Sequence, residues 1–139
     1  MGTPAQNVAI LKEAYRQWHD TRGASVKVWL DLMAEDVKVR SLADGKPAAS
    51  FTTEGNSKEQ FKRYFDGLLA EWDMIHYKTD QFIAEGDRVA MLGSTAWRNR
   101  RTGREVHTPK ADFWTFRDGK IVAFYELYDT AALIAAAQP

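Results

Sequence analysis

The chain has 139 residues, 45% of them hydrophobic and 27% charged, which is the composition of one ordinary globular domain spanning residues 1–139. Nineteen basic residues balance nineteen acidic ones, so we expect neither nucleic acid nor a membrane among its partners. The absence of cysteine excludes disulfides, thiolate metal sites and a cysteine nucleophile. Because no signal peptide or long apolar segment is evident either, we predict a cytoplasmic protein.

The first half of the chain is expected to form three helices. After a Thr-Pro start, apolar residues recur with helical spacing over residues 8–18, and Gly23 ends this pattern. A second, shorter helix follows over 26–33, and a Ser-x-x-Gln capping box opens a third over 57–72. Between the last two, residues 37–41 alternate as a strand, and the loop ADGKPAASFTTEG is placed to cover the mouth of a pocket.

The second half changes to the period of β-strands. The turn signals EGD, NRRTGR and RDG separate four strands, at residues 74–84, 88–98, 105–116 and 120–128. The Ala-rich end, TAALIAAAQP, reads as a short C-terminal helix. Helices followed by an antiparallel meander predict an α+β fold, with three N-terminal helices packed on one face of a curved antiparallel sheet.

The register of the last hairpin decides which side chains share a face. If residues 117–119 form a three-residue loop with a left-handed glycine, Asp112 lies opposite Phe124 and Lys110 lies opposite Glu126. All even-numbered positions of the two strands then share one face. A register shifted by one residue would separate these three ionisable groups.

Both faces of this hairpin are mainly apolar. The odd-numbered face carries Ala111, Phe113, Thr115, Ile121, Ala123, Tyr125 and Leu127. A sheet in water needs only one apolar face, and the chain has too few helices to cover two. We therefore predict a homodimer through the sheet face that the helices leave open.

Three ionisable residues on the even-numbered face are the candidates for chemistry. Asp112 and Glu126, as close carboxylates with little water, can hold one proton between them and act as general acid or base. The alternative is structural, with Lys110 and Glu126 forming a cross-strand ion pair and Asp112 bonded to a loop. His76 joins the catalytic candidates if the EGD and TGR turns are tight, although a lone histidine on a strand is more often a surface or packing residue.

Large amphipathic rings fall on predicted inward faces and suggest an apolar cavity for a small hydrophobic molecule, with core packing as the alternative. Arg40, near the loop, either meets an acidic ligand group or is solvated. No histidine spacing, calcium loop or phosphate-binding glycine motif is found, so we expect no metal and no cofactor. The predicted ligand-binding residues are Tyr15, Trp18, Arg40, Tyr64, Trp97, Lys110, Trp114 and Tyr128.

A family resemblance accompanies these patterns. Three helices followed by a bent sheet, together with TGREV and ADFWTFRDGKIVAFYELYDTAAL, make nearly the whole chain similar to the nuclear transport factor 2-like superfamily, in its SnoaL-like and ketosteroid-isomerase-like branch. The resemblance implies a cone-shaped curved sheet around a ligand pocket. It implies no single activity, because this fold hosts isomerases, dehydratases, cyclases, epoxide hydrolases and non-catalytic modules.

The resemblance carries over to particular residues unevenly. Asp112 matches the aspartic acid that assists the oxyanion in ketosteroid isomerases, but Ser41 stands where their general-base aspartate would fall, and Tyr15 matches their helix-one tyrosine only with a shift. Glu126 resembles the last-strand carboxylate of limonene-epoxide-hydrolase-like members, whereas Gly93 and Thr95 stand at the positions of their Arg-x-Asp. Steroid isomerisation and epoxide hydrolysis are therefore disfavoured. The acid/base residue of SnoaL-like cyclases can correspond to Asp112 or Glu126.

Three functions remain open on the sequence. The first is a cofactor-independent isomerase, cyclase or dehydratase that acts on a small apolar carbonyl compound by proton transfer, with Lys110 or Tyr128 stabilising an enolate. The second is a module that binds a hydrophobic ligand without chemistry. The third is a dimerisation scaffold with a filled core.

Overall fold

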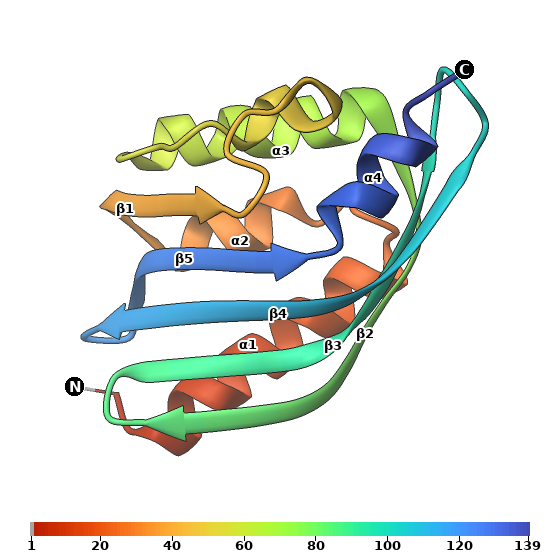
Figure 1. Ribbon diagram of the computed structural model, residues 1–139. Coiled ribbons are helices and arrows are strands. Elements are labelled where there is room, and N and C mark those ends of the chain that lie inside the picture. The colour runs from red at the N-terminus through yellow and green to blue at the C-terminus, as the bar shows by residue number, and fades with distance from the viewer. Residues whose placement is uncertain (1) are drawn as a thin grey trace.

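Helices fill most of the first half of the chain and strands most of the second half in the computed structural model, which describes residues 2–139 (Figure 1). In chain order the elements are α1 (Pro4–Asp20), α2 (Val26–Leu32), β1 (Met33–Ser41), the 3₁₀ helix η1 (Pro47–Thr52), α3 (Lys58–Glu71), β2 (Trp72–Glu85), β3 (Arg88–Asn99), β4 (Glu105–Arg117), β5 (Lys120–Tyr128) and α4 (Thr130–Ala136). This arrangement confirms the predicted α+β class, with a short helix at the C-terminus.

The five strands form one open, curved sheet in the order β1-β5-β4-β3-β2 (Figure 1). Strands β2 to β5 are the predicted antiparallel meander, but β1 pairs with β5 in parallel, an arrangement that the strand pattern did not predict. The sheet bends where β2 carries two bulges, at Ile75 and Asp80. At Gly93, opposite the second bulge, a Cβ atom would lie 2.0 Å from the Lys78 carbonyl oxygen, so a glycine is required for this close approach of the two strands.

Local signals account for the two long helices. The Thr3 hydroxyl caps α1 and the Gln6 side chain returns the bond to the Thr3 backbone, while Ser57 accepts a hydrogen bond from the Gln60 amide at the start of α3. Helix α2 is shorter than its apolar spacing suggests, because the chain becomes extended at Met33 and begins β1 there. The strand thus starts four residues before the predicted position.

The β4–β5 turn differs from the expected three-residue loop. Arg117 pairs with Lys120, so the turn has only Asp118 and Gly119, both with positive φ, at 51° and 80°. One extra residue, Val122, then bulges out of β5, since the register shifts between the Phe116 and Thr115 pairs. The shorter turn and the bulge together move the register by two residues, which keeps the even positions beyond the bulge on the inner face.

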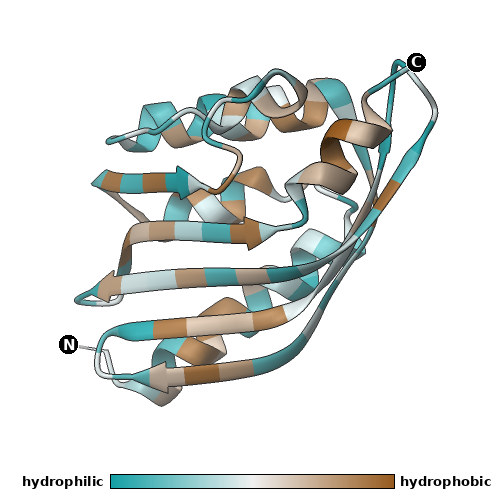
Figure 2. Ribbon diagram, viewed as in Figure 1, coloured by the Kyte–Doolittle hydropathy of each residue, from teal (hydrophilic) through white to brown (hydrophobic). Residues whose placement is uncertain are grey.

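The helices cover one face of the sheet and leave the other open. Hydrophobic residues occur along both β4 and β5 (Figure 2), and those on the inner face pack with α1 and α3 in a continuous core. Ile121, predicted on the outer face, is fully buried because it precedes the bulge. The outer face exposes the large apolar residues Ile83, Leu92, Phe113 and Tyr125, each between 37% and 53% accessible. Within residues 2–139, no helix combines the length and apolarity needed to cross a membrane.

Candidate functional site

A cavity lies between the inner face of the sheet and the helices. Its volume is about 80 Å³. One water needs roughly 10 to 15 Å³ of such space, so the core is not completely filled. The lining residues are mainly aromatic: Tyr15, Trp18, Trp29, Phe51, Phe61, Tyr64, Phe65, Leu68, Trp72, Tyr77, Thr95, Trp97, Val106, Thr108, Lys110, Asp112, Trp114, Phe124, Glu126, Tyr128 and Leu133.

The partly exposed lining residues mark where this cavity approaches the surface. Phe51 of η1, Leu68 of α3 and Leu133 of α4 are each half-buried, so the predicted loop, the third helix and the C-terminal helix frame this end. Gly67 allows η1 to pack directly on α3, because a Cβ atom at this position would lie 2.3 Å from the Cβ atom of Phe51. The loop therefore contributes to the cavity, as its position in the sequence predicted.

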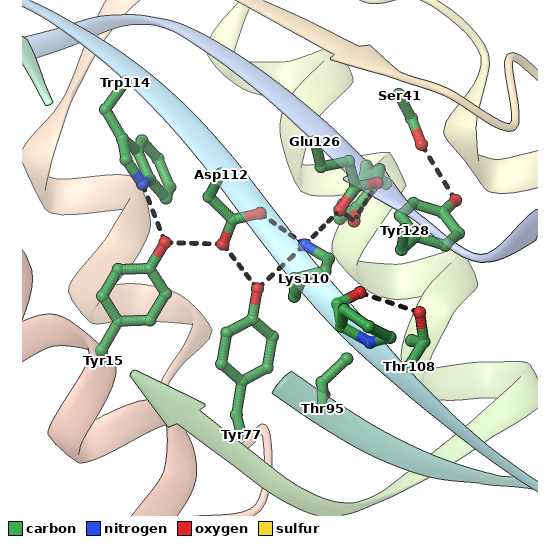
Figure 3. A network of polar contacts seen from close by, with 12 residues as sticks. Tyr15, Ser41, Tyr77, Thr95, Thr108, Lys110, Asp112, Trp114, Glu126 and Tyr128 are labelled. Atoms are coloured by element: carbon green, nitrogen blue, oxygen red, sulfur yellow. Dashed lines mark hydrogen bonds and ion pairs between the residues drawn. The ribbon is translucent and has the colours of Figure 1, made fainter. Parts of the chain in front are cut away.

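The polar end of the cavity is built around a buried ammonium group (Figure 3). The Nζ atom of Lys110 lies 2.5 Å from Oδ1 of Asp112 and 2.9 Å from Oε1 of Glu126, and all three side chains are at most 7% exposed. The two carboxylates meet because Asp112 pairs directly with Glu126 across β4 and β5. With both carboxyls ionised, this triad carries one net negative charge in a low-dielectric environment.

Tyrosines from two other elements hold Asp112 in place. Tyr15 of α1 and Tyr77 of β2 donate to its Oδ2 atom at 2.6 Å and 2.5 Å, and the indole N–H of Trp114 donates to the Tyr15 oxygen at 2.8 Å. Lys110 donates its third hydrogen to the Tyr77 oxygen at 2.9 Å. Asp112 thus accepts three hydrogen bonds, one of them from a cation.

Glu126 has a different set of partners. Besides Lys110 it accepts from the hydroxyl of Tyr64, on α3, which lies 2.8 Å from each carboxylate oxygen. Two residues further along β5, the Tyr128 hydroxyl is 3.0 Å from the Ser41 hydroxyl, and either can donate. Glu126 and Tyr128 therefore share the inner face of β5. The Tyr64 hydroxyl lies beside Glu126, and the Ser41 hydroxyl lies beside Tyr128.

The charged groups and their burial shift the proton affinities of the site. Burial alone lowers the pKa of the Lys110 ammonium, but the carboxylates of Asp112 and Glu126 outweigh it and hold that pKa above its usual value of 10.5. Burial, and then the charge of a neighbouring carboxylate, raises the pKa of the Tyr64 and Tyr77 phenols well above 10.0. At neutral pH the lysine is a cation and these phenols are neutral hydrogen-bond donors.

Most of the predicted site residues come together in this cavity. Two catalytic candidates, Asp112 and Glu126, line it, and so do seven of the predicted ligand-binding residues: Tyr15, Trp18, Tyr64, Trp97, Lys110, Trp114 and Tyr128. The triad combines two interpretations that the sequence left as alternatives, since Lys110 and Glu126 do form an ion pair and Asp112 joins it inside the cavity.

His76 and Arg40 do not reach the cavity. The bulge at Ile75 turns His76 to the outer face, where its ring centroid lies 6.1 Å from that of His107. Burial, and then the charge of Lys78, lowers the pKa of this histidine. Arg40 points away from the inner face and forms an ion pair with Glu54 at 2.8 Å. These two predicted site residues therefore lie outside the cavity, because neither side chain faces it.

Tyr77 is the main site residue that sequence reasoning missed. Alternation from Met74 places it on the outer face, and only the bulge at Ile75 turns it inward toward Lys110 and Asp112. Ser41 was noted only because it stands where the isomerases have their general-base aspartate. In the structure it is the hydrogen-bond partner of Tyr128. No sequence signal marks the bulge, whereas the short β1 pattern did indicate that Ser41 faces inward.

Metal ligands are not gathered anywhere in the described part of the chain, since no three histidine, aspartate or glutamate residues of 2–139 are arranged to hold an ion. The polar end of the cavity is instead a lysine, two carboxyl groups and several hydroxyls. Such groups can transfer protons and stabilise a developing oxyanion.

Comparison with solved structures identifies similar folds over almost the whole chain. A nuclear transport factor 2-like protein from Burkholderia thailandensis is 27% identical, with all of both chains covered and a TM-score of 0.80. A second such protein, from Burkholderia xenovorans, is 21% identical over 98% of each chain, with a TM-score of 0.81. A protein from Mesorhizobium loti, described as a candidate SnoaL-like polyketide cyclase, is 16% identical over 87% of this chain and 97% of its own, with a TM-score of 0.71.

A search of curated proteins gave no significant match. The family model of the SnoaL-like domain matches residues 12–124, a segment that includes the second half of α1, the whole of β2 to β4 and the first part of β5, and with them Tyr15, Tyr64, Tyr77, Lys110 and Asp112. The resemblance noted in the sequence is thereby confirmed. The chain belongs to the SnoaL-like domain family.

Proposed function

We propose that this protein is a cofactor-independent acid–base catalyst of the isomerase, cyclase or dehydratase kind, acting on a small, largely apolar carbonyl compound. The observation that carries the proposal is the Lys110, Asp112 and Glu126 triad at the end of an aromatic cavity. Carboxylates held away from water at such a site can accept a proton from a carbon next to a carbonyl group. The aromatic walls suit an apolar substrate body.

The relatives support this class of chemistry without naming the substrate. Membership of the SnoaL-like family and the likeness to the Mesorhizobium loti protein fit an acid–base reaction on a carbonyl compound. The fold itself serves many reactions, so the residues of the cavity carry the greater weight.

A second candidate is a module that binds a small hydrophobic molecule without chemistry. One observation favours it: all three hydrogens of Lys110 are already taken by Asp112, Glu126 and Tyr77. A ligand would then meet a polar end that is already satisfied and would be held mainly by the aromatic walls.

Deuterium exchange separates these candidates. The purified protein is incubated in D₂O with 2-tetralone, a small apolar ketone with exchangeable α-hydrogens, and melting temperature and deuterium incorporation are followed together. A catalyst raises its melting temperature saturably with ketone and accelerates exchange above the buffer rate. Glu126→Gln should slow this exchange by about 10² to 10⁴-fold, the usual contribution of a general base. Saturable stabilisation without exchange indicates the binding module. If neither stabilisation nor exchange is observed, both proposals are contradicted.

We also propose that a second copy of this chain covers the outer face of the sheet. The exposed residues Ile83, Leu92, Phe113 and Tyr125 lie on the face that none of the helices of residues 2–139 covers. Exposed apolar surface of this kind on a soluble domain is commonly an interface.

A further inference from the structure

The ammonium hydrogens of Lys110 and the tyrosine hydrogens near Asp112 all form hydrogen bonds within the protein. Lys110 gives its three hydrogens to Asp112, Glu126 and Tyr77, and Asp112 in turn accepts from Lys110, Tyr15 and Tyr77. Three donors, one of them charged, stabilise the carboxylate form of Asp112. Taking up a proton there would disrupt at least one of these bonds.

Glu126 has unused capacity. Its four lone-pair sites receive one hydrogen from Lys110 and one from Tyr64, whose single O–H lies 2.8 Å from both carboxylate oxygens. Within residues 2–139, the Tyr64 hydroxyl makes no other hydrogen bond. It can therefore rotate, accept a hydrogen from a protonated Glu126, and turn its own hydrogen into the cavity.

Tyr128 and Ser41 have one hydrogen to spare. The two hydroxyls hold two hydrogens but share a single bond of 3.0 Å, and Tyr128 lines the cavity whereas Ser41 does not. When Ser41 donates, the Tyr128 hydrogen is available to an oxygen in the cavity. Tyr128 follows Glu126 by two positions on β5, so their backbones are about 7 Å apart on one face. A carbonyl compound can span this distance.

We propose that these hydrogen bonds determine which residues act in the reaction and which only hold others in position. Glu126, assisted by Tyr64, moves the proton, and Tyr128, positioned by Ser41, donates to the oxyanion. Lys110 and Asp112 form a fixed pair that orients Glu126. This inference rests on the proposed function and assigns the base to Glu126 rather than to Asp112.

The step balances without any further reagent. The Glu126 carboxylate removes a proton from the carbon beside the carbonyl group, and the C–H electron pair becomes the new C=C bond. The carbonyl π electrons move to oxygen, and the resulting oxyanion accepts the hydrogen bond from Tyr128. Glu126 then returns its proton to a carbon of the same enolate, so nothing is oxidised or reduced.

Conservative variants test the division of roles with 2-tetralone exchange as the readout. Tyr128→Phe should lower kcat and kcat/KM together by about 10² to 10³-fold, the usual effect of removing one oxyanion donor, because that bond strengthens only in the transition state. Ser41→Ala should act in the same direction but less. Tyr64→Phe should move the acidic limb of the kcat/KM profile to higher pH, because Glu126 loses a donor to its ionised form. Ser50→Ala is the control for loss of a hydroxyl, since Ser50 is exposed and does not line the cavity, and it should change neither the rate constants nor the pH profile.

The outcomes are distinguishable from failure of the proposed function itself. Absence of exchange by the wild-type protein overturns the proposed function and this inference with it. Wild-type exchange that persists in Tyr128→Phe and keeps its pH profile in Tyr64→Phe overturns only the division of roles. Both phenylalanine variants retain the ring that lines the cavity, so they keep the inference testable where Glu126→Gln fails to fold.

Discussion

Asp112 lies directly opposite Glu126 on β4 and β5, and the ammonium of Lys110 contacts both carboxylates. Two buried negative charges therefore depend on one positive charge. Removing one member of such a group leaves a charge without compensation, which costs more than the ion pair itself contributes. Both the stability and the proposed chemistry of the protein thus depend on a single lysine.

Lys110→Met should destabilise the protein by about 3 to 5 kcal/mol at neutral pH, because it leaves Asp112 and Glu126 buried without a counter-charge. Urea unfolding followed by tryptophan fluorescence measures this. Lys78→Met, an exposed lysine on β2, is the matched control and should leave the unfolding midpoint nearly unchanged. A Lys110→Met midpoint equal to that of the wild type would show that the triad is not ionised as described.

The same lysine predicts a loss of stability at alkaline pH. The folded-state pKa of Lys110 is raised above 10.5, so its contribution is fully present below about pH 10.5 and is lost as the pH rises further toward the folded-state pKa. Unfolding midpoints measured from about pH 9 to about pH 12 should fall in the wild type. The difference between wild type and Lys110→Met should shrink over the same window; a constant difference contradicts the assignment.

Gly67→Ala sets two effects against each other. Alanine favours a helix by about 1 kcal/mol over glycine. Its Cβ atom, however, would lie 2.3 Å from the Cβ atom of Phe51 and would push η1 off α3. Overpacking of this kind costs about 1 to 3 kcal/mol, so we expect a net decrease in melting temperature. Asp66→Ala, exposed on the same helix, is the control for helix propensity, and a stabilised Gly67→Ala variant would show that η1 can move away freely.

Gly119→Ala tests the two-residue turn. Gly119 has φ of 80° and no atom within 4 Å of the position of a Cβ atom, so the cost is backbone strain alone, about 1 kcal/mol. Gly119→Asn should cost less, because asparagine tolerates the left-handed region better. Equal stability of the alanine variant and the wild type, measured by thermal unfolding, would mean that the turn adopts another conformation in solution.

Phe113→Glu should convert the proposed homodimer to a monomer, because it places a charge at the centre of the apolar outer face. Sedimentation velocity measures the mass of both proteins, and circular dichroism checks that the variant stays folded. Lys62→Glu, on the solvent face of α3, is the control for the added charge and should leave the dimer intact. A wild-type protein that sediments as a monomer rejects this interface.

The sequence by itself determined the elements that depend on local signals. Helix α1 follows from its Thr-Pro start and helical spacing, helix α3 follows from its Ser-x-x-Gln capping box, and the β4–β5 hairpin follows from the turn signal at residues 117–119. The family resemblance and the aromatic interior were also readable, because both depend on residue type and order rather than on exact pairing.

Only the tertiary structure decided which side chains meet. The Ile75 bulge turned Tyr77 inward and His76 outward, and the Val122 bulge offset a turn one residue shorter than expected, so that Asp112 still shares a face with Glu126. A bulge adds one residue to one strand where two strands bend over the helices, and this depends on both partners and on the core beneath them. No local pattern encodes it, whereas a shift of one residue exchanges the inner and outer faces of a strand.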